Sequence, residues 1–334
     1  MAEPTRPGRL RDLDVTRDLG PVADLLEQAF AGDLDEYGRR VIREMRSYHR
    51  LAPILGTGLR VMLGWGHSFT AVVWEVDGRV VGHAMAVRSW SDTSRWQVAN
   101  VAVDASFRGR GIGRALMVGL LERLQAFAPE WIVLQVREEN QVARHLYESL
   151  GFHTLCGEIH WYREATQPLL PASPPALSLR PLRFYRLSAL HRLLDRSFTP
   201  EGLWWWMVRY PRPRRSFAES LKRLVGLWVE ERWGYWEEGR LLAVVGLRGD
   251  RSQQKGEWIV RVDRSRWGQW EPELIRWALI RSRQLGLLQL RTVTEMGYDA
   301  LNQTLAQEGF RPRHRLLNMR LRGKMDEGDI MRKA

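Results

Sequence analysis

The stretch that decides the fold is Val101–Ala115, VAVDASFRGRGIGRA, in which a β-rich run passes into a helix through a glycine-rich turn. Glycine lacks a Cβ, so it adopts positive φ and lets the backbone approach a ligand closely. Successive N–H groups can then point into one concavity, and the helix start favours an anion there. Arg108, Arg110 and Arg114 add positive charge. The stretch therefore predicts a turn that binds phosphate.

Three known phosphate-binding patterns compete for this turn. A P-loop needs Gly-Lys followed by Ser or Thr, which the segment lacks. A Rossmann turn, G-x-G-x-x-G/A, fails in both frames, because Arg114 or Leu116 stands where Gly or Ala is needed. The third pattern, Arg/Gln-x-x-Gly-x-Gly/Ala, is met by Arg108, Gly111 and Gly113. Here the segment closely resembles motif A of the GNAT superfamily of N-acetyltransferases.

The resemblance extends over residues 9–163, whose predicted elements follow the order of a GNAT domain. Alternating apolar runs indicate strands, helical spacing indicates helices, and Asp77-Gly78 is a hairpin signal. From Ile112 the helix should be amphipathic, and its expected apolar face consists of Ile112, Leu116, Leu120, Leu124 and Phe127. The predicted elements are a strand at 9–14, helices at 22–30 and 35–50, a hairpin of 68–78 and 79–90, a strand at 95–104, a helix from 112, a strand at 131–136 and a helix at 140–152.

The resemblance implies that acetyl-CoA is the co-substrate. In the family, the strand before the turn pairs with the pantetheine arm, the turn holds the pyrophosphate, and an Asn at the place of Asn140 reaches the pantetheine. The implied acetyl-CoA-binding residues are Val101, Ala102, Val103, Arg108, Gly109, Arg110, Gly111, Ile112, Gly113, Arg114, Asn140 and Arg144.

The implied reaction is transfer of the acetyl group to a primary amine by direct attack in a ternary complex. The departing thiolate benefits from a proton donor, and the resemblance makes Tyr147 the candidate catalytic residue. An alternative is that Tyr147 simply packs, because it follows Ala143 by four residues. On the same helix, Val142, Leu146 and Leu150 are expected to point inward.

The general base stays unassigned. Some GNAT enzymes have a glutamate at about the position of Gln97, and an amide cannot act as a base. Deprotonation of the amine through a chain of water molecules is an equally good reading. The remaining acid–base candidates in this half are Glu75, His83, Asp92, Glu158 and His160.

The C-terminal half repeats the pattern in degraded form. Its hairpin turns at Glu238-Gly239, and GYDALNQTLAQEGF mirrors NQVARHLYESLGF. The turn itself is changed, because SRWGQW replaces RGRGIG and keeps only Gly268 of its glycines. Two indoles there should obstruct a pyrophosphate, and Leu305 stands at the place of Tyr147. Ten of the 16 tryptophans lie in this half, so a tryptophan-lined cleft for an apolar or cationic group is possible beside ordinary core packing.

The fold class expected is mixed α/β, as two tandem GNAT-like domains, each a mostly antiparallel sheet flanked by helices. A chain of 334 residues suits two domains. The segment TQPLLPASPPALS has four prolines and no charge, which is typical of a linker. The expected boundaries are an acetyltransferase domain at 1–165, a linker at 166–178, a degenerate domain at 179–323 and a tail at 324–334.

Composition limits the partners. The net charge of +12 divides into −1 for residues 1–176 and +13 for 177–334. This basic excess, with the cluster at Arg209–Ser216, permits an alternative function as a non-catalytic acyl-CoA-binding or nucleic-acid-associated regulator. No nucleic-acid-binding signature supports it, so the partner expected is a small-molecule or peptide amine. With one cysteine, no apolar run of membrane length and no signal peptide, we expect a cytoplasmic monomer or homodimer without metal.

Overall fold

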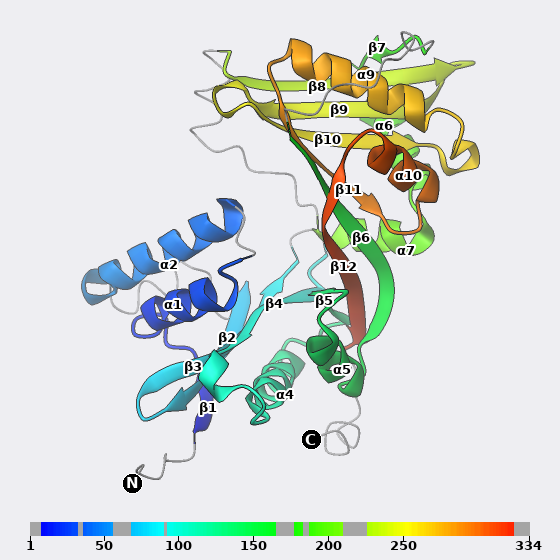
Figure 1. The fold of residues 1–334 in the computed structure, drawn as a ribbon. Coiled ribbons are helices and arrows are strands. Elements are labelled where there is room, and N and C mark those ends of the chain that lie inside the picture. The colour runs from blue at the N-terminus through cyan, green and yellow to red at the C-terminus, as the bar shows by residue number, and fades with distance from the viewer. Residues whose placement is uncertain are drawn as a thin grey trace. The chain divides into compact units, whose positions relative to one another are not determined.

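The computed structural model describes residues 8–32, 36–55, 68–89, 92–164, 177–182, 187–209 and 226–323 (Figure 1). The chain forms two compact units, each of which contains strands and helices. Unit 1 comprises Met1–Gln135, Asn140–His153 and Met319–Ala334. Unit 2 comprises Val136–Glu139 and Thr154–Asn318.

The sheet of unit 1 has the strand order β1-β2-β3-β4-β5. Neighbouring strands are antiparallel except for β4 and β5, which are parallel. The turn between β2 and β3 is at Asp77 and Gly78, both with positive φ, as the sequence predicts. The strands are β1 (Arg9–Asp12), β2 (Phe69–Val76), β3 (Arg79–Arg88), β4 (Arg95–Val103) and β5 (Trp131–Arg137).

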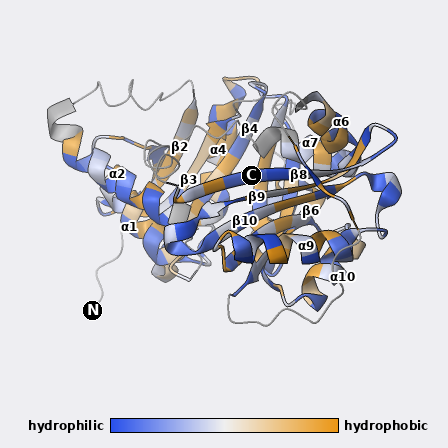
Figure 2. Ribbon diagram, turned by 90° about the horizontal axis from the view of Figure 1, so that it is seen from above, coloured by the Kyte–Doolittle hydropathy of each residue, from blue (hydrophilic) through white to orange (hydrophobic). Residues whose placement is uncertain are grey.

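Helices of unit 1 bury apolar faces against this sheet. Helices α1 (Leu19–Ala29) and α2 (Glu36–Leu55) form a core with residues of β2 and β3. Helix α4 (Ile112–Gln125) buries the predicted apolar face, which Figure 2 shows in orange. It lies directly on Gly82 of β3, where an added Cβ would come within 2.9 Å of Leu116. This close contact fixes where the start of α4 lies.

The last helix of unit 1, α5 (Gln141–Ser149), differs from expectation in the face it buries. Val142 is 85% exposed, so its predicted inward position is wrong. Leu150, just after the helix, is buried as predicted, and Tyr147 is the residue of α5 that is buried. In a helix of nine residues one tyrosine and its neighbours fill the interface, which leaves the first turn outside.

The sheet of unit 2 has the order β12-β6-β11-β10-β9-β8-β7. Strand β6 pairs antiparallel with β11, so the strand that ends the predicted first domain lies, from Thr154, in the second unit. Residues 154–163 of β6 are thus grouped with unit 2, whereas the expected boundary of the first domain lies at 165. The strands are β6 (His153–Arg163), β7 (Arg180–Pro181), β8 (Trp228–Glu237), β9 (Arg240–Asp250), β10 (Lys255–Val262), β11 (Gln289–Glu295) and β12 (Arg311–Arg322).

The helices of unit 2 are α6 (Leu187–Ser197), α7 (Pro200–Arg209), α9 (Glu271–Gln284) and α10 (Asp299–Gln307). A local motif of unit 1 recurs here. Asp104 caps a 3-10 turn, Ala105–Phe107, and pairs with Arg79, while Asp263 caps Arg264–Arg266 and pairs with Arg240. The internal repeat that the sequence indicates therefore extends to this turn, whose capping hydrogen bond and ion pair are the same in both units.

Several expectations lie outside the described residues. They concern the tail at 324–334, most of the linker at 166–178 and most of the basic cluster at 209–216. Among the helices that are described, none has the length and apolar character needed to cross a membrane.

Candidate active site

A bulge in β4 shapes the candidate site. Asn100 has a φ of 55°, and the β3–β4 register shifts between His83, opposite Ala102, and Met85, opposite Ala99. Asparagine adopts the left-handed conformation more readily than most residues. Sequence reasoning missed this bulge, although an asparagine within an otherwise β-rich run was a usable signal.

Strands β4 and β5 separate just before the bulge. Their parallel ladder joins Arg95–Gln97 to Trp131–Val133 and ends there. Ala102 and Val103 still pair with β3 on the other side. The segment Val101–Val103 is thus the part of β4 past the end of its ladder with β5, where an extended ligand can bind along the strand edge.

The glycine-rich turn follows directly. Gly109 and Gly111 have φ of 75° and 76°, and Gly111 is the N-cap of α4. Within the described residues, the backbone N–H groups of 109–114 donate no hydrogen bond to any protein atom. No described atom lies within 4 Å of a Cβ added at Gly109 or Gly111, and residues 108–111 are exposed. The turn therefore presents six successive N–H groups, with open space at Gly109 and Gly111, as an anion site requires.

The three arginines of the turn are anchored by the protein. Nε of Arg108 donates to the carbonyl of Val103 at 3.1 Å, and Nη2 of Arg110 donates to that of Ser106 at 3.0 Å. Nη1 of Arg114 donates to Oγ of Ser149 at 2.9 Å. The last bond links the start of α4 to the end of α5, so the turn and the helix carrying Tyr147 lie together.

Helix α5 places the other predicted residues. Asn140 is its N-cap, and its Oδ1 accepts from N–H of Ala143 at 3.1 Å. Arg144 is half-buried on the same helix. Tyr147 is buried with its ring edge-on to Phe152, and burial raises the pKa of Tyr147 to about 12. The phenol is protonated at neutral pH, and its raised pKa makes it a weaker acid than an ordinary tyrosine.

The base candidates of unit 1 do not suit that role. The carboxylate of Glu75 binds Arg9, Arg11 and Arg17, and hydrogen bonds from Arg11 in particular lower its pKa. A hydrogen bond from Ser94 lowers the pKa of Asp92.

His83 is fully buried, and desolvation lowers its pKa to about 4. Glu158 and His160 belong to unit 2. Among the described residues, no group of three or more His, Cys, Asp or Glu side chains is placed to hold a metal ion.

The corresponding turn of unit 2 is filled by its own side chain. The buried carboxylate of Glu271 accepts from N–H of Gly268 at 2.9 Å and of Trp270 at 3.0 Å. The hydroxyl of Tyr298 donates to it at 2.5 Å, and the Tyr298 ring stacks on Trp267 at 3.9 Å between centroids. The expectation that the two indoles obstruct this turn stays a prediction, and sequence reasoning missed the carboxylate, which accepts from two backbone amides of the turn.

Comparison with known proteins agrees with this geometry. The model of the acetyltransferase (GNAT) family matches residues 40–152. An N-alpha-acetyltransferase of Sulfurisphaera tokodaii is 32% identical over 112 residues, which are 30% of this chain and 67% of that protein. The [ribosomal protein bS18]-alanine N-acetyltransferase of Haemophilus ducreyi is 35% identical over 63 residues, 19% of this chain and 43% of that protein. The chain thus spans less than half of the latter relative.

Solved structures extend the likeness to the whole chain. The GCN5-related N-acetyltransferase of Sphaerobacter thermophilus superposes with a TM-score of 0.62 at 17% identity, covering 95% of this chain and 96% of that one. A tandem GNAT protein from the clavulanic acid biosynthesis pathway gives 0.53 at 16% identity, covering 96% and 100%. These likenesses show the fold, which is the expected mixed α/β, mostly antiparallel tandem arrangement. The chain belongs to the GNAT family of N-acetyltransferases, whose members use acetyl-CoA.

Proposed function

We propose that the chain transfers an acetyl group from acetyl-CoA to a primary amine, and that the turn at 108–114 holds the pyrophosphate. The observation that carries this proposal is the run of backbone N–H groups of residues 109–114 at the start of α4, which have no acceptor within the part of the chain that the structure describes. Such groups favour a phosphate, and the anchored arginines add positive charge around it.

The remaining binding residues follow from the same geometry. The backbone of Val101–Val103, past the β4–β5 ladder, pairs with the pantetheine arm. Because Oδ1 of Asn140 caps α5, its NH2 group is the part that donates to the pantetheine. Arg144, one turn further on, is the remaining residue that we assign to acetyl-CoA.

The chemical step is direct attack in a ternary complex. The neutral amine nitrogen bonds to the thioester carbonyl carbon, and the C–S bond then breaks. The departing sulfur takes its proton from the Tyr147 hydroxyl, the nitrogen loses its extra proton to water, and the Tyr147 phenolate takes a proton back from water, which closes the cycle. What supports this role is the bond from Arg114 to Ser149, which ties the helix that carries Tyr147 to the start of α4.

The acceptor is best described as an α-amino group at the start of a polypeptide. The α-amino group has a pKa of about 8, against about 10.4 for a lysine side chain. Near pH 8 a large fraction of such an amine is neutral, so its attack needs no strong base. This matters because none of the candidate bases Glu75, His83 and Asp92 in unit 1 is in a suitable state. The names of the relatives, an N-alpha-acetyltransferase and a ribosomal-protein-alanine N-acetyltransferase, support the same acceptor class.

Unit 2 has lost acetyl-CoA binding in this proposal. The Glu271 carboxylate already accepts from the backbone amides of the turn, and its charge repels a pyrophosphate. The full chain should therefore bind one acetyl-CoA.

Calorimetric titration of the full chain with acetyl-CoA tests the proposal. Gly111→Trp should abolish binding, because the indole would enter the open space over the amides. Gly78→Trp is the matched control, since Gly78 has a φ of 78° and equally open surroundings but lies in the β2–β3 hairpin. One site in the wild type and the control, and none in Gly111→Trp, is expected. Equal binding by both variants would exclude this turn.

Catalysis is tested separately from binding. Thiol release from acetyl-CoA should be steady and dependent on a peptide with a free N-terminus, and absent with the same peptide blocked at that end. Binding without any turnover would favour the non-catalytic alternative.

A further inference from the structure

Helix α5, which carries Tyr147, is held in unit 1 by few buried contacts. It has nine residues, and Tyr147 is the one that is buried. A helix of this length is marginally stable without tertiary packing. The position of the Tyr147 hydroxyl therefore depends on whatever else fixes α5.

Two contacts join the end of α5 to the start of α4. Nη1 of Arg114 donates to Oγ of Ser149 at 2.9 Å, and that hydroxyl donates to the carbonyl of Leu146 at 2.7 Å. A Cβ added at Gly113 would lie 3.6 Å from Cδ2 of Leu146, so the glycine-rich turn packs directly on α5. Because Tyr147 lies between Leu146 and Ser149 in the sequence, a change in the strength of this contact acts on the helical turn that carries the phenol.

The side chain of Arg114 keeps a charge that this bond does not balance. The Ser149 hydroxyl is a neutral acceptor, and within the part of the chain that the structure describes no carboxylate pairs with Arg114. A long side chain also loses rotamer freedom when it is fixed by one hydrogen bond. By itself the bond therefore stabilises α5 only weakly.

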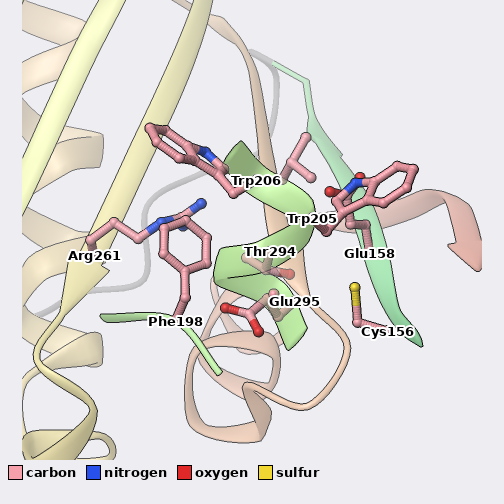
Figure 3. A pocket seen from close by; sticks show the side chains of 10 residues that line it. Cys156, Glu158, Phe198, Trp205, Trp206, Arg261, Thr294 and Glu295 are labelled. Atoms are coloured by element: carbon pink, nitrogen blue, oxygen red, sulfur yellow. The ribbon is translucent and has the colours of Figure 1, made fainter. Parts of the chain in front are cut away.

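The counterpart helix of unit 2, α10, has the same length but is fixed by its own side chains. Thr294, which Figure 3 shows beside the small cavity of this unit, donates to Oδ1 of Asn302 at 2.5 Å. The end of α10 is tied to α9 by an ion pair of Arg276 with the buried carboxylate of Glu308, at 3.0 Å. Here the charge of the arginine is balanced without a ligand. Four residues of α10 are buried, namely Leu301, Asn302, Thr304 and Leu305.

We propose that the Arg114–Ser149 bond couples the turn to Tyr147. A pyrophosphate bound at the amides of 109–114 balances the charge of Arg114 and fixes its guanidinium. The bond to Ser149 then costs no further rotamer freedom, so it stabilises α5 and holds the Tyr147 hydroxyl in place. Ser149 is thus a positioning residue that acts through Arg114.

This inference rests on the proposed function, because it needs the turn to bind the pyrophosphate. It also says what the remote end of the co-substrate does for the chemical step. Binding energy gained at the pyrophosphate is used to fix the proton donor near the thioester, so a thioester without that group should react more slowly even at saturation.

Amide hydrogen exchange of the full chain with inorganic pyrophosphate tests the coupling without any turnover. This probe carries the charge but has no pantetheine arm, so it fills the turn without reaching along β4. At saturation and constant ionic strength it should slow exchange at the turn and also in residues 144–152. The effect in the helix should be about fivefold or more, the lower end of ordinary coupling between two sites.

Three variants test the named bond. Ser149→Ala should keep the protection of the turn and lose that of α5, and a weaker helix cannot explain the loss because alanine is the better helix former. Ser149→Thr keeps the hydroxyl and should behave as wild type. Ser47→Ala on α2 is the matched control, since Ser47 also donates to a helical carbonyl, at 2.9 Å, and accepts from Arg50, at 3.4 Å.

Kinetics give a readout that a purely structural role would not separate. With acetyl-CoA and a peptide with a free N-terminus, Ser149→Ala should lower kcat by about tenfold. With S-acetylpantetheine, which lacks the pyrophosphate, the loss should be less than about twofold. Equal losses with the two thioesters would make Ser149 a structural residue and contradict the coupling.

The exchange experiment also separates this inference from the function on which it rests. If pyrophosphate protects neither the turn nor α5, the proposed binding site is wrong and the coupling is wrong with it. If the turn is protected while α5 is not, or if α5 is protected equally in the wild type and Ser149→Ala, the binding site stands and the coupling alone is overturned.

Discussion

Nδ1 of His83 donates a hydrogen bond to the backbone carbonyl of Asn100, at 2.9 Å. A carbonyl only accepts, so Nδ1 carries the proton of a neutral imidazole. The bond joins β3 to the bulge residue of β4, where the regular ladder is interrupted. His83 thus stabilises the bulge after which β4 carries the proposed pantetheine edge, and its role is structural rather than that of a base.

This relationship predicts an acid-sensitive fold. The pKa of His83 is about 4 in the folded chain and about 6.5 when unfolded, so the unfolded state binds more protons between these values. Stability is therefore present above pH 6.5 and falls by about 3 kcal/mol as the pH drops to 4. His83→Asn keeps a donor without a titrating group. Urea unfolding should show that the free energy of unfolding falls less between pH 7 and pH 4.5 for the variant than for the wild type. An equal fall in both proteins would contradict the burial of a neutral His83.

Tyr147→Phe should lower kcat by about 10²–10⁴ while leaving acetyl-CoA binding nearly unchanged, because only the proposed proton donor is lost. The phenylalanine ring keeps the edge-on contact with Phe152. An aryl thioester, whose thiolate leaves without protonation, should show a much smaller loss. Tyr162→Phe, on β6, is the control and should behave as wild type. Equal losses with both thioesters would assign Tyr147 to packing alone.

The pH dependence of kcat/KM should follow the acceptor amine. Gln97 stands where some GNAT enzymes have a glutamate, and the candidate bases Glu75, Asp92 and His83 are engaged in other contacts or buried. The neutral fraction of the amine therefore sets the rate. Peptides whose N-terminal amines differ in pKa should give profiles that rise tenfold per pH unit and level off near each amine's own pKa, about 8 for an ordinary peptide. A midpoint that is the same for all peptides would reveal a dedicated base.

Local patterns predicted the elements and the turn well. The hairpin at Asp77 and Gly78, the buried face of α4 and the positive φ of Gly111 all depend on a few neighbouring residues. The bulge at Asn100 was not predicted, because it depends on His83 of the neighbouring strand. The Glu271 carboxylate was missed although two of its donors, the amides of Gly268 and Trp270, are close to it in the sequence.

The placement of β6 was missed for the same reason. Its sequence reads as a strand, but alternation of apolar residues does not specify which neighbour a strand pairs with. The pairing of Glu158 with Glu295, over more than a hundred residues, is a consequence that only the folded chain shows.

Glu271 tests the proposal that, in the turn of unit 2, a side-chain carboxylate takes the place of a bound phosphate. Its carboxylate accepts from two backbone amides at the start of α9 and from Tyr298. Glu271→Gln removes the charge and turns one acceptor into a donor facing other donors. This should destabilise unit 2 by about 2–3 kcal/mol, since hydrogen bonds to buried charged groups are among the strongest.

Glu273→Gln is the matched control, because Glu273 lies in the same first turn of α9 and loses the same charge. Any general effect of charge near the helix start is common to both variants, so their difference isolates the hydrogen bonds of Glu271. Urea unfolding followed by near-ultraviolet circular dichroism, which reports on the stack of Trp267 and Tyr298, measures it. Equal unfolding midpoints for the two variants would mean that the Glu271 carboxylate does not stabilise the turn.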